Sequence, residues 1–167
     1  MAQKLMQKEY TDITQSINGI AEEINLVLNS RNKERYFEEI ILLYSFIENL
    51  LKWLVFVKIL WQKSDKELTQ KEANKLRSFC KKLNFYNALY MAFSISLIDF
   101  NLYKRIDMIR EERNNVIHQF WMYSHRNNLL VLRKKLEKLA GVANQLVGIF
   151  NQLAQEVGID EVYEIFL

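Results

Sequence analysis

The sequence contains no proline, four glycines, one cysteine and two histidines in 167 residues. Strands and tight turns normally need glycine and proline, so a chain with so little of either is predicted to be all helical. The single cysteine, Cys80, excludes an intrachain disulfide and a cysteine-rich zinc site. Because Met1 is followed by polar residues rather than by a signal sequence, we expect a protein of the reducing cytoplasm.

The longest apolar run could be mistaken for a membrane span. It reads IILLYSFIENLLKWLVFVKILW, from Ile40 to Trp61, but Glu48, Lys52 and Lys58 interrupt it. Each charge would be costly in lipid, so we predict a central helix covered by its neighbours and no membrane partner. Half of the residues are hydrophobic, which suffices for one sizeable core, and we expect a single domain over residues 1–167.

Hydrophobic spacing predicts an antiparallel bundle of about five to six helices. A break at Asn29 to Asn32 separates the first two helices, and Ser64 or Asp65 would cap the third. The first and last helices carry apolar residues at alternating spacings of three and four, which face either the bundle's own core or, in part, a subunit interface. The predicted helices are at about residues 3–29, 33–62, 68–82, 84–98, 102–123 and 127–157.

Charge is distributed unevenly along the chain, whose formal net charge is +3. Residues 63–138 carry 16 basic and 8 acidic side chains, whereas residues 1–62 carry 7 and 8 and residues 139–167 carry none and 4. The basic middle segment suits an anionic partner such as nucleic acid, although solvated lysine faces are also common.

One stretch, EERNNVIHQFW from Glu111 to Trp121, combines an arginine and a histidine on one predicted helix. At about 100° per residue, Arg113 falls in the middle of the apolar stripe, and His118 lies about 140° further round. A permanent charge among apolar residues is costly unless it is paired or lines a polar cleft. Glu48 is the best candidate partner, because it interrupts the apolar face of the helix at 33–62.

Several other chemistries lack their residues. The sequence has no glycine-rich phosphate loop, no zinc-ligand spacing and no serine nucleophile motif, so we expect neither a metal nor a cofactor. The adjacent acid pairs at 22–23, 38–39 and 111–112 splay across helix surfaces, and we interpret most of them as solvated faces.

Arginine and histidine together suit phosphoryl chemistry on RNA. The arginine fork can stabilise the charge of a pentacoordinate transition state, and histidine can take a proton from a ribose 2′-hydroxyl or give one to the leaving oxygen. One histidine cannot be base and acid at once. A two-fold dimer, however, would bring two copies of Arg113 and His118 to a shared cleft.

These residues resemble the motif of the HEPN domains, small helical bundles that typically dimerise and carry an arginine, four to six residues, then a histidine. Here Arg113 and His118 enclose four residues, and Asn114 matches the polar residue that often follows the arginine. The segments FIENLLKWLV, KLRSFCKKLNF and LYMAFSISLID follow the order typical of the family, so the resemblance covers residues 33–155. It implies a homodimeric, metal-independent endoribonuclease of a toxin or phage-defence type, with Glu48 and Asn114 as supporting residues and an antitoxin or regulatory protein as a further partner.

The sequence departs from one HEPN subgroup, and the family also offers an alternative function. In HEPN toxins paired with nucleotidyltransferase antitoxins a tyrosine stands two residues after the histidine, whereas Phe120 stands there in this sequence, which argues against regulation at that position. Other family members have lost activity, so a noncatalytic interaction or RNA-binding module is the alternative function. Candidate RNA contacts, some of which could equally be core or loop residues, are Arg110, Lys104, Arg105, Trp121 and His125.

Overall fold

The computed structural model describes the main chain of residues 2–63, 69–118 and 128–156, and the side chains of all of these except 2–9, 117 and 118. Within these ranges the chain forms six helices and no strand, which confirms the predicted all-helical bundle. The helices are α1 (Ala2–Leu28), α2 (Lys33–Gln62), α3 (Gln70–Lys82), α4 (Phe85–Ser94), α5 (Phe100–His118) and α7 (Leu129–Glu156).

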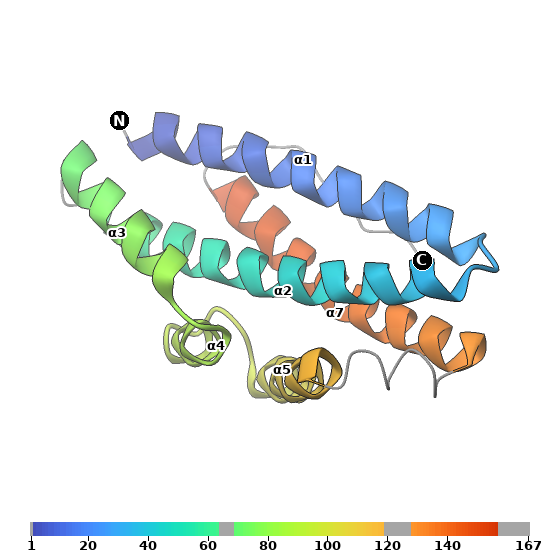
Figure 1. Cartoon of the computed structure of the whole chain (residues 1–167). Coiled ribbons are helices and arrows are strands. Elements are labelled where there is room, and N and C mark those ends of the chain that lie inside the picture. Colours follow the sequence, from blue (N-terminus) through green and yellow to red (C-terminus); the bar gives the residue numbers. More distant parts are fainter. Residues whose placement is uncertain (1, 64–68, 119–127, 157–167) are drawn as a thin grey trace.

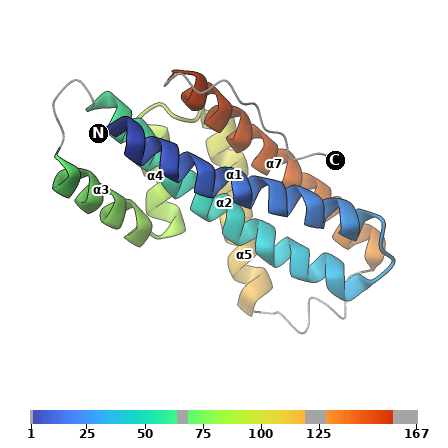
Figure 2. The same ribbon diagram turned by 90° about the horizontal axis from the view of Figure 1, so that it is seen from above.

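Helix α2 lies at the centre of the arrangement (Figure 1). Helix α1 runs antiparallel to α2 along one side, and α7 packs along another, while α4 and α5 cross beneath at a steep angle (Figures 1 and 2). The antiparallel arrangement holds for α1 and α2. Helices α2 and α7, by contrast, run in the same direction (Figure 2). Helices α3, α4 and α5 connect them in the chain.

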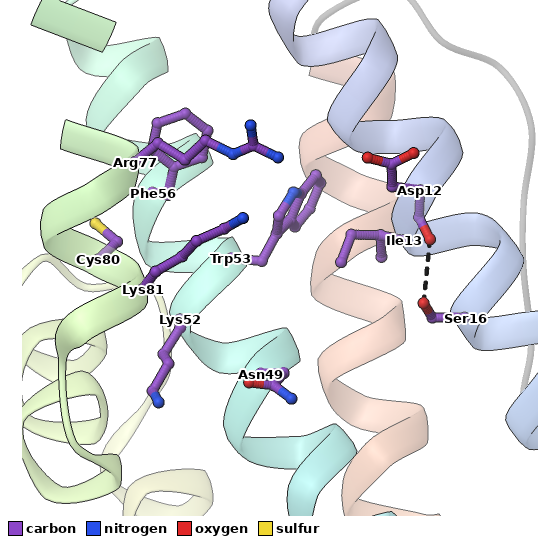
Figure 3. Close-up of a pocket in the computed structure, with 10 residues that line it drawn as sticks. All are labelled: Asp12, Ile13, Ser16, Asn49, Lys52, Trp53, Phe56, Arg77, Cys80 and Lys81. Carbon is purple, nitrogen blue, oxygen red and sulfur yellow. Dashed lines mark hydrogen bonds between the residues drawn. The ribbon is translucent and has the colours of Figure 1, made fainter. Parts of the chain in front are cut away.

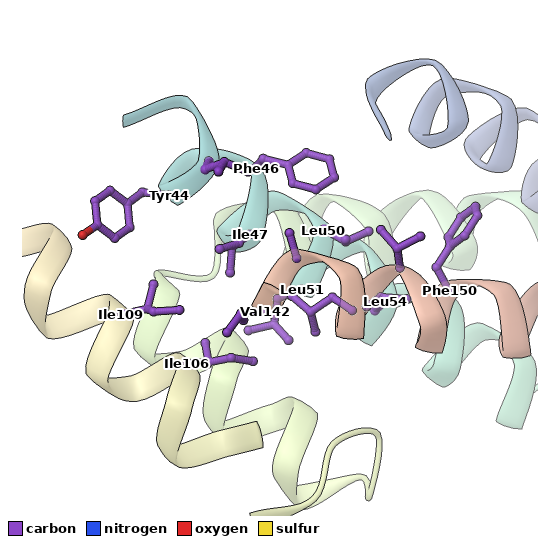
Figure 4. Close-up of a cluster of buried hydrophobic side chains, with 14 of the residues drawn as sticks. Tyr44, Phe46, Ile47, Leu50, Leu51, Leu54, Ile106, Ile109, Val142 and Phe150 are labelled. Carbon is purple, nitrogen blue, oxygen red and sulfur yellow. The ribbon is translucent and has the colours of Figure 1, made fainter. Parts of the chain in front are cut away.

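The core is built around the apolar face of α2, as Figure 4 shows. Leu51 and Leu54 are fully buried and lie among side chains from α5 and α7. By length and composition α2 could cross a membrane, yet 61% of its most apolar stretch is buried inside the protein. The neighbours that cover it include Ile106, Ile109, Val142 and Phe150.

Short polar side chains begin five of the described helices by accepting a hydrogen bond from a main-chain amide in the first turn. The third helix begins at Thr69, where Glu72 completes a capping box, rather than near Ser64 or Asp65, which lie outside the described residues. The capping residues of the other four helices are Asn32, Asn84, Asp99 and Asn128.

Helix α4 is shorter than the predicted segment 84–98, because the chain turns sharply after Ser94. Ser96 adopts a left-handed conformation with φ of 54°. The Leu97 amide donates to the Ala92 carbonyl oxygen at 2.9 Å, and the Ser96 amide donates to that of Phe93 at 3.0 Å. This pair of hydrogen bonds is the Schellman ending, which usually contains glycine, and the missing glycine hid it in the sequence.

Candidate functional site

Arg113 forms an ion pair between α5 and α2. Its Nη2 atom lies 3.2 Å from Oε2 of Glu48, so the expected pairing of these two side chains is present. The other carboxylate oxygen of Glu48 accepts a hydrogen bond from Lys52 Nζ at 2.6 Å. Glu48 therefore holds one cation on each oxygen where the two helices meet.

Helix phase places Arg113 toward α2. Ile106, Ile109 and Val116 lie on the same side of α5 and are buried in the core. The Arg113 side chain is 28% exposed and that of Glu48 is 14% exposed. Arg113 thus lies at the edge of the core, where its charge is compensated by Glu48 and is still reachable from solvent.

The guanidinium keeps donor capacity beyond its contact with Glu48. Arg113 Nε is buried and has no hydrogen-bond partner among the described residues, and an arginine carries five N–H donors in a fixed planar fork. A partly exposed fork that a carboxylate holds in place can bind a phosphate oxygen in a defined orientation.

His118 is the last residue of α5, and its side chain lies outside the described part of the chain. It lies five positions after Arg113 in the sequence, which on an α-helix corresponds to about 7.5 Å along the axis. Asn114 is exposed on the surface of α5. The main chain therefore places all three motif residues within the last two turns of one helix.

The candidate phosphate contacts fall on two different sides of α5. Lys104 Nζ lies 4.3 Å from the centre of the Phe100 ring, and Arg110 lies over Tyr86, with 5.5 Å between the guanidinium carbon and the ring centre. Arg105 instead donates from Nη1 to Oε1 of Gln145 on α7 at 2.9 Å. Lys104 and Arg110 thus lie against aromatic rings, whereas Arg105 contacts α7.

Two predicted RNA contacts, Trp121 and His125, lie outside the described residues, as does Phe120. The structure therefore describes the helix that carries the motif as far as residue 118, together with Lys104, Arg105 and Arg110.

The adjacent acid pairs do not all form solvated faces. Glu39 is only 2% exposed, and its Oε1 atom has no hydrogen-bond partner among the described residues. Burial, helped by the nearby charge of Glu23, raises the pKa of Glu39 to about 7. Glu112 pairs with the buried Lys135 of α7, so it joins two helices rather than facing water alone. Glu22, Glu23, Glu38 and Glu111 are exposed, as expected.

A charged cavity of about 250 Å³ lies between α1, α2 and α3 (Figure 3). Lys52, Arg77 and Lys81 line it together with Asp12, and Trp53 lies between them (Figure 3). Lys52 both lines this cavity and contacts Glu48, so a single side chain links the cavity to the ion pair of Arg113.

Sequence reasoning missed Lys52 as part of the site. Its signal is the spacing of four residues from Glu48, since side chains at i and i+4 meet on one face of a helix. The exposed rings of α4 were also missed. Tyr86, Tyr90 and Phe93 follow a spacing of four and three, which predicts a helix face but does not say whether that face is covered.

Replacing Glu48 by alanine is expected to lower the free energy of unfolding by about 2 kcal/mol, because Lys52 and Arg113 would then share a partly buried site without a carboxylate. The matched control is Glu111→Ala on the surface of α5, with an expected change below about 0.5 kcal/mol. Urea unfolding followed by circular dichroism measures both. Equal changes in the two variants would show that the Glu48 pair adds nothing to stability.

Comparison of the chain with protein-family models, with curated proteins and with solved structures finds no match.

Proposed function

We propose that the protein is a HEPN-like, metal-independent endoribonuclease that acts as a homodimer. The observation that carries the proposal is the position of Arg113, held by Glu48 at the edge of the core five residues before His118 on the same helix. An arginine fixed in this way, with donors to spare, suits a phosphate that gains charge during reaction.

The proposed reaction cleaves the RNA backbone by internal transesterification. The ribose 2′-oxygen attacks the adjacent phosphorus, a bond forms between them, and the bond from phosphorus to the 5′-oxygen breaks. The products are a 2′,3′-cyclic phosphate and a 5′-hydroxyl. His118 of one subunit accepts the 2′-hydroxyl proton, His118 of the other donates a proton to the leaving 5′-oxygen, and Arg113 stabilises the charged phosphorane between them.

Glu48 would act as a positioning residue. It neutralises Arg113 and fixes its orientation without contacting the RNA, since both of its oxygens already bind cations of its own chain. Asn114, exposed beside Arg113, is the proposed polar neighbour of the scissile phosphate.

A cytoplasmic toxin or defence role is part of the same proposal, with RNA as the substrate and an antitoxin or regulatory protein as the partner that restrains it. The support is the resemblance of the Arg113 to His118 motif to HEPN ribonucleases and the basic middle segment, residues 63–138, that contains it.

The test is cleavage of a labelled single-stranded RNA in EDTA by the wild type, Arg113→Ala and His118→Ala. Each substitution is expected to lower the rate at least about 100-fold, because each removes a group that acts only in the transition state. Arg133→Ala, at an exposed arginine of α7 paired with Glu137, is the matched control and should keep full activity. Mass spectrometry should find a cyclic phosphate on the upstream product.

Two results would contradict this proposal. Cleavage that survives both motif substitutions would show that Arg113 and His118 are not catalytic. A strictly monomeric mass in solution at the assay concentration would remove the shared site. Tight RNA binding by a wild type that cleaves nothing would instead favour the noncatalytic RNA-binding module.

A further inference from the structure

Helices α4 and α5 expose a group of aromatic rings on their outer side. Tyr86, Tyr90 and Phe100 are 50%, 57% and 54% exposed, and Phe93 is 38% exposed. Tyr103, which is partly buried, completes the group. We name these five side chains the aromatic surface.

The rings form one continuous group where the two helices meet. Phe93 of α4 contacts both rings of α5, with its ring centre 5.1 Å from that of Tyr103 and 6.0 Å from that of Phe100. The rings of Phe100 and Tyr103 are nearly parallel, at 11°, and their centres are 6.3 Å apart. Tyr86 and Tyr90 extend the group along α4, one helical turn apart.

The exposed rings are not required to fill the core. The opposite face of α4 already packs inward through Phe85, Ala88, Leu89 and Ala92, all of which are buried. Leaving several large rings in water forgoes the free energy that their burial would contribute, so an apolar patch of this kind marks a surface that another molecule covers.

Cations lie directly on this surface. Lys104 approaches the face of Phe100 and Arg110 approaches that of Tyr86. Asp107 is neutralised by Arg110, whose Nε lies 2.8 Å from Oδ1. Rings flanked by lysine and arginine match the two features of a nucleic-acid strand, namely planar bases and phosphates.

We propose that the aromatic surface binds single-stranded RNA by base stacking and leads the strand along α5 toward Arg113. This inference rests on the proposed ribonuclease function and names the form of its substrate. Phe100 and Arg113 are thirteen residues apart on one helix, about 20 Å along its axis, a distance that a few nucleotides of single strand can cover. Duplex RNA keeps its bases stacked on one another and cannot offer them to the rings.

Stacking rather than phosphate neutralisation should dominate the affinity. Glu111 Oε1 lies 3.5 Å from Arg110 Nη2, so Arg110 faces two carboxylates. Lys104, Asp107, Arg110 and Glu111 together carry no net charge, so the α5 part of the surface is nearly neutral. We therefore expect the affinity for RNA to fall only weakly with rising salt, since few counterions are released.

The test uses the full chain with His118→Ala, which prevents cleavage, and a fluorescent 12-nucleotide RNA without secondary structure. Tyr90→Ala and Phe100→Ala are each expected to raise the dissociation constant about 10-fold, and the double variant by more. Phe79→Ala removes an equally exposed ring from α3 and should leave binding unchanged. A blunt duplex of the same length should bind all variants alike. Circular dichroism checks that every variant is folded.

Unchanged affinity for the single strand in the double variant would overturn the proposal. So would a fall in solution mass from dimer to monomer with RNA affinity unchanged, because a second copy of the chain would then cover these rings. The binding assay does not depend on cleavage. Failure of Arg113 or His118 as catalytic residues therefore shows in the cleavage assay alone, and failure of the aromatic surface shows in the binding assay alone.

Discussion

Phe150→Ala is expected to lower the free energy of unfolding by about 3–5 kcal/mol, the range for removing a fully buried aromatic ring. Phe150 lies on α7 where three helices meet. Its ring stacks on Tyr10 of α1 with centres 4.8 Å apart at 13°, and its centre is 5.1 Å from that of Trp53 on α2. The lost stability would combine two contributions: the hydrophobic free energy of burying the ring, and the cost of the cavity left between the three helices.

The matched control is Leu130→Ala, which removes an exposed apolar side chain from the same helix and should change stability by less than about 0.5 kcal/mol. Urea unfolding of the wild type and both variants at one fixed protein concentration, followed by circular dichroism, measures the differences in stability. A loss below about 1 kcal/mol for Phe150→Ala would mean that α1 and α7 do not pack through this ring.

Glu39 is expected to make the protein less stable as pH rises from about 5 to 7. Burial first, and then the charge of Glu23, raises the pKa of Glu39 from an ordinary 4.5 to about 7. Between pH 4.5 and about 7, the Glu39 carboxyl keeps its proton in the folded protein and loses it in the unfolded chain. The free energy of unfolding therefore falls as pH rises, and it reaches its lower level above pH 7. The raised pKa corresponds to about 3 kcal/mol at most.

The measurement is the free energy of unfolding of wild type and Glu39→Gln at several pH values between 5 and 8. The amide does not titrate, so the variant should gain on the wild type progressively up to pH 7, whatever constant difference the substitution adds. Glu38→Gln, at the exposed neighbouring position, should follow the wild type at every pH. A constant difference between Glu39→Gln and wild type over this range would show that Glu39 titrates normally.

The sequence located the helices well because their signals are local. A spacing of three and four apolar residues and capping side chains such as Asn84 depend only on neighbours in the chain. The same local geometry placed Arg113 on the buried side of α5. It also identified Glu48 as its partner, since a charge in an apolar face requires compensation.

The misjudged features depend on packing between distant segments. Nothing near Glu39 distinguishes it from the exposed Glu38, and only the neighbours that cover α2 decide which of them is buried. The turn at Ser96 depends on a left-handed conformation that serine adopts rarely.

By itself, the sequence determined that this chain is a helical bundle with an arginine in the apolar stripe of one helix that requires a compensating partner, because helix periodicity and the cost of burying a charge act over a few residues. Only the tertiary structure decided that Lys52 shares Glu48 with Arg113, that α2 and α7 run in the same direction, and that rings of α4 and α5 meet on an uncovered surface. These features depend on which helix faces lie against each other, and a periodic pattern does not specify its partner.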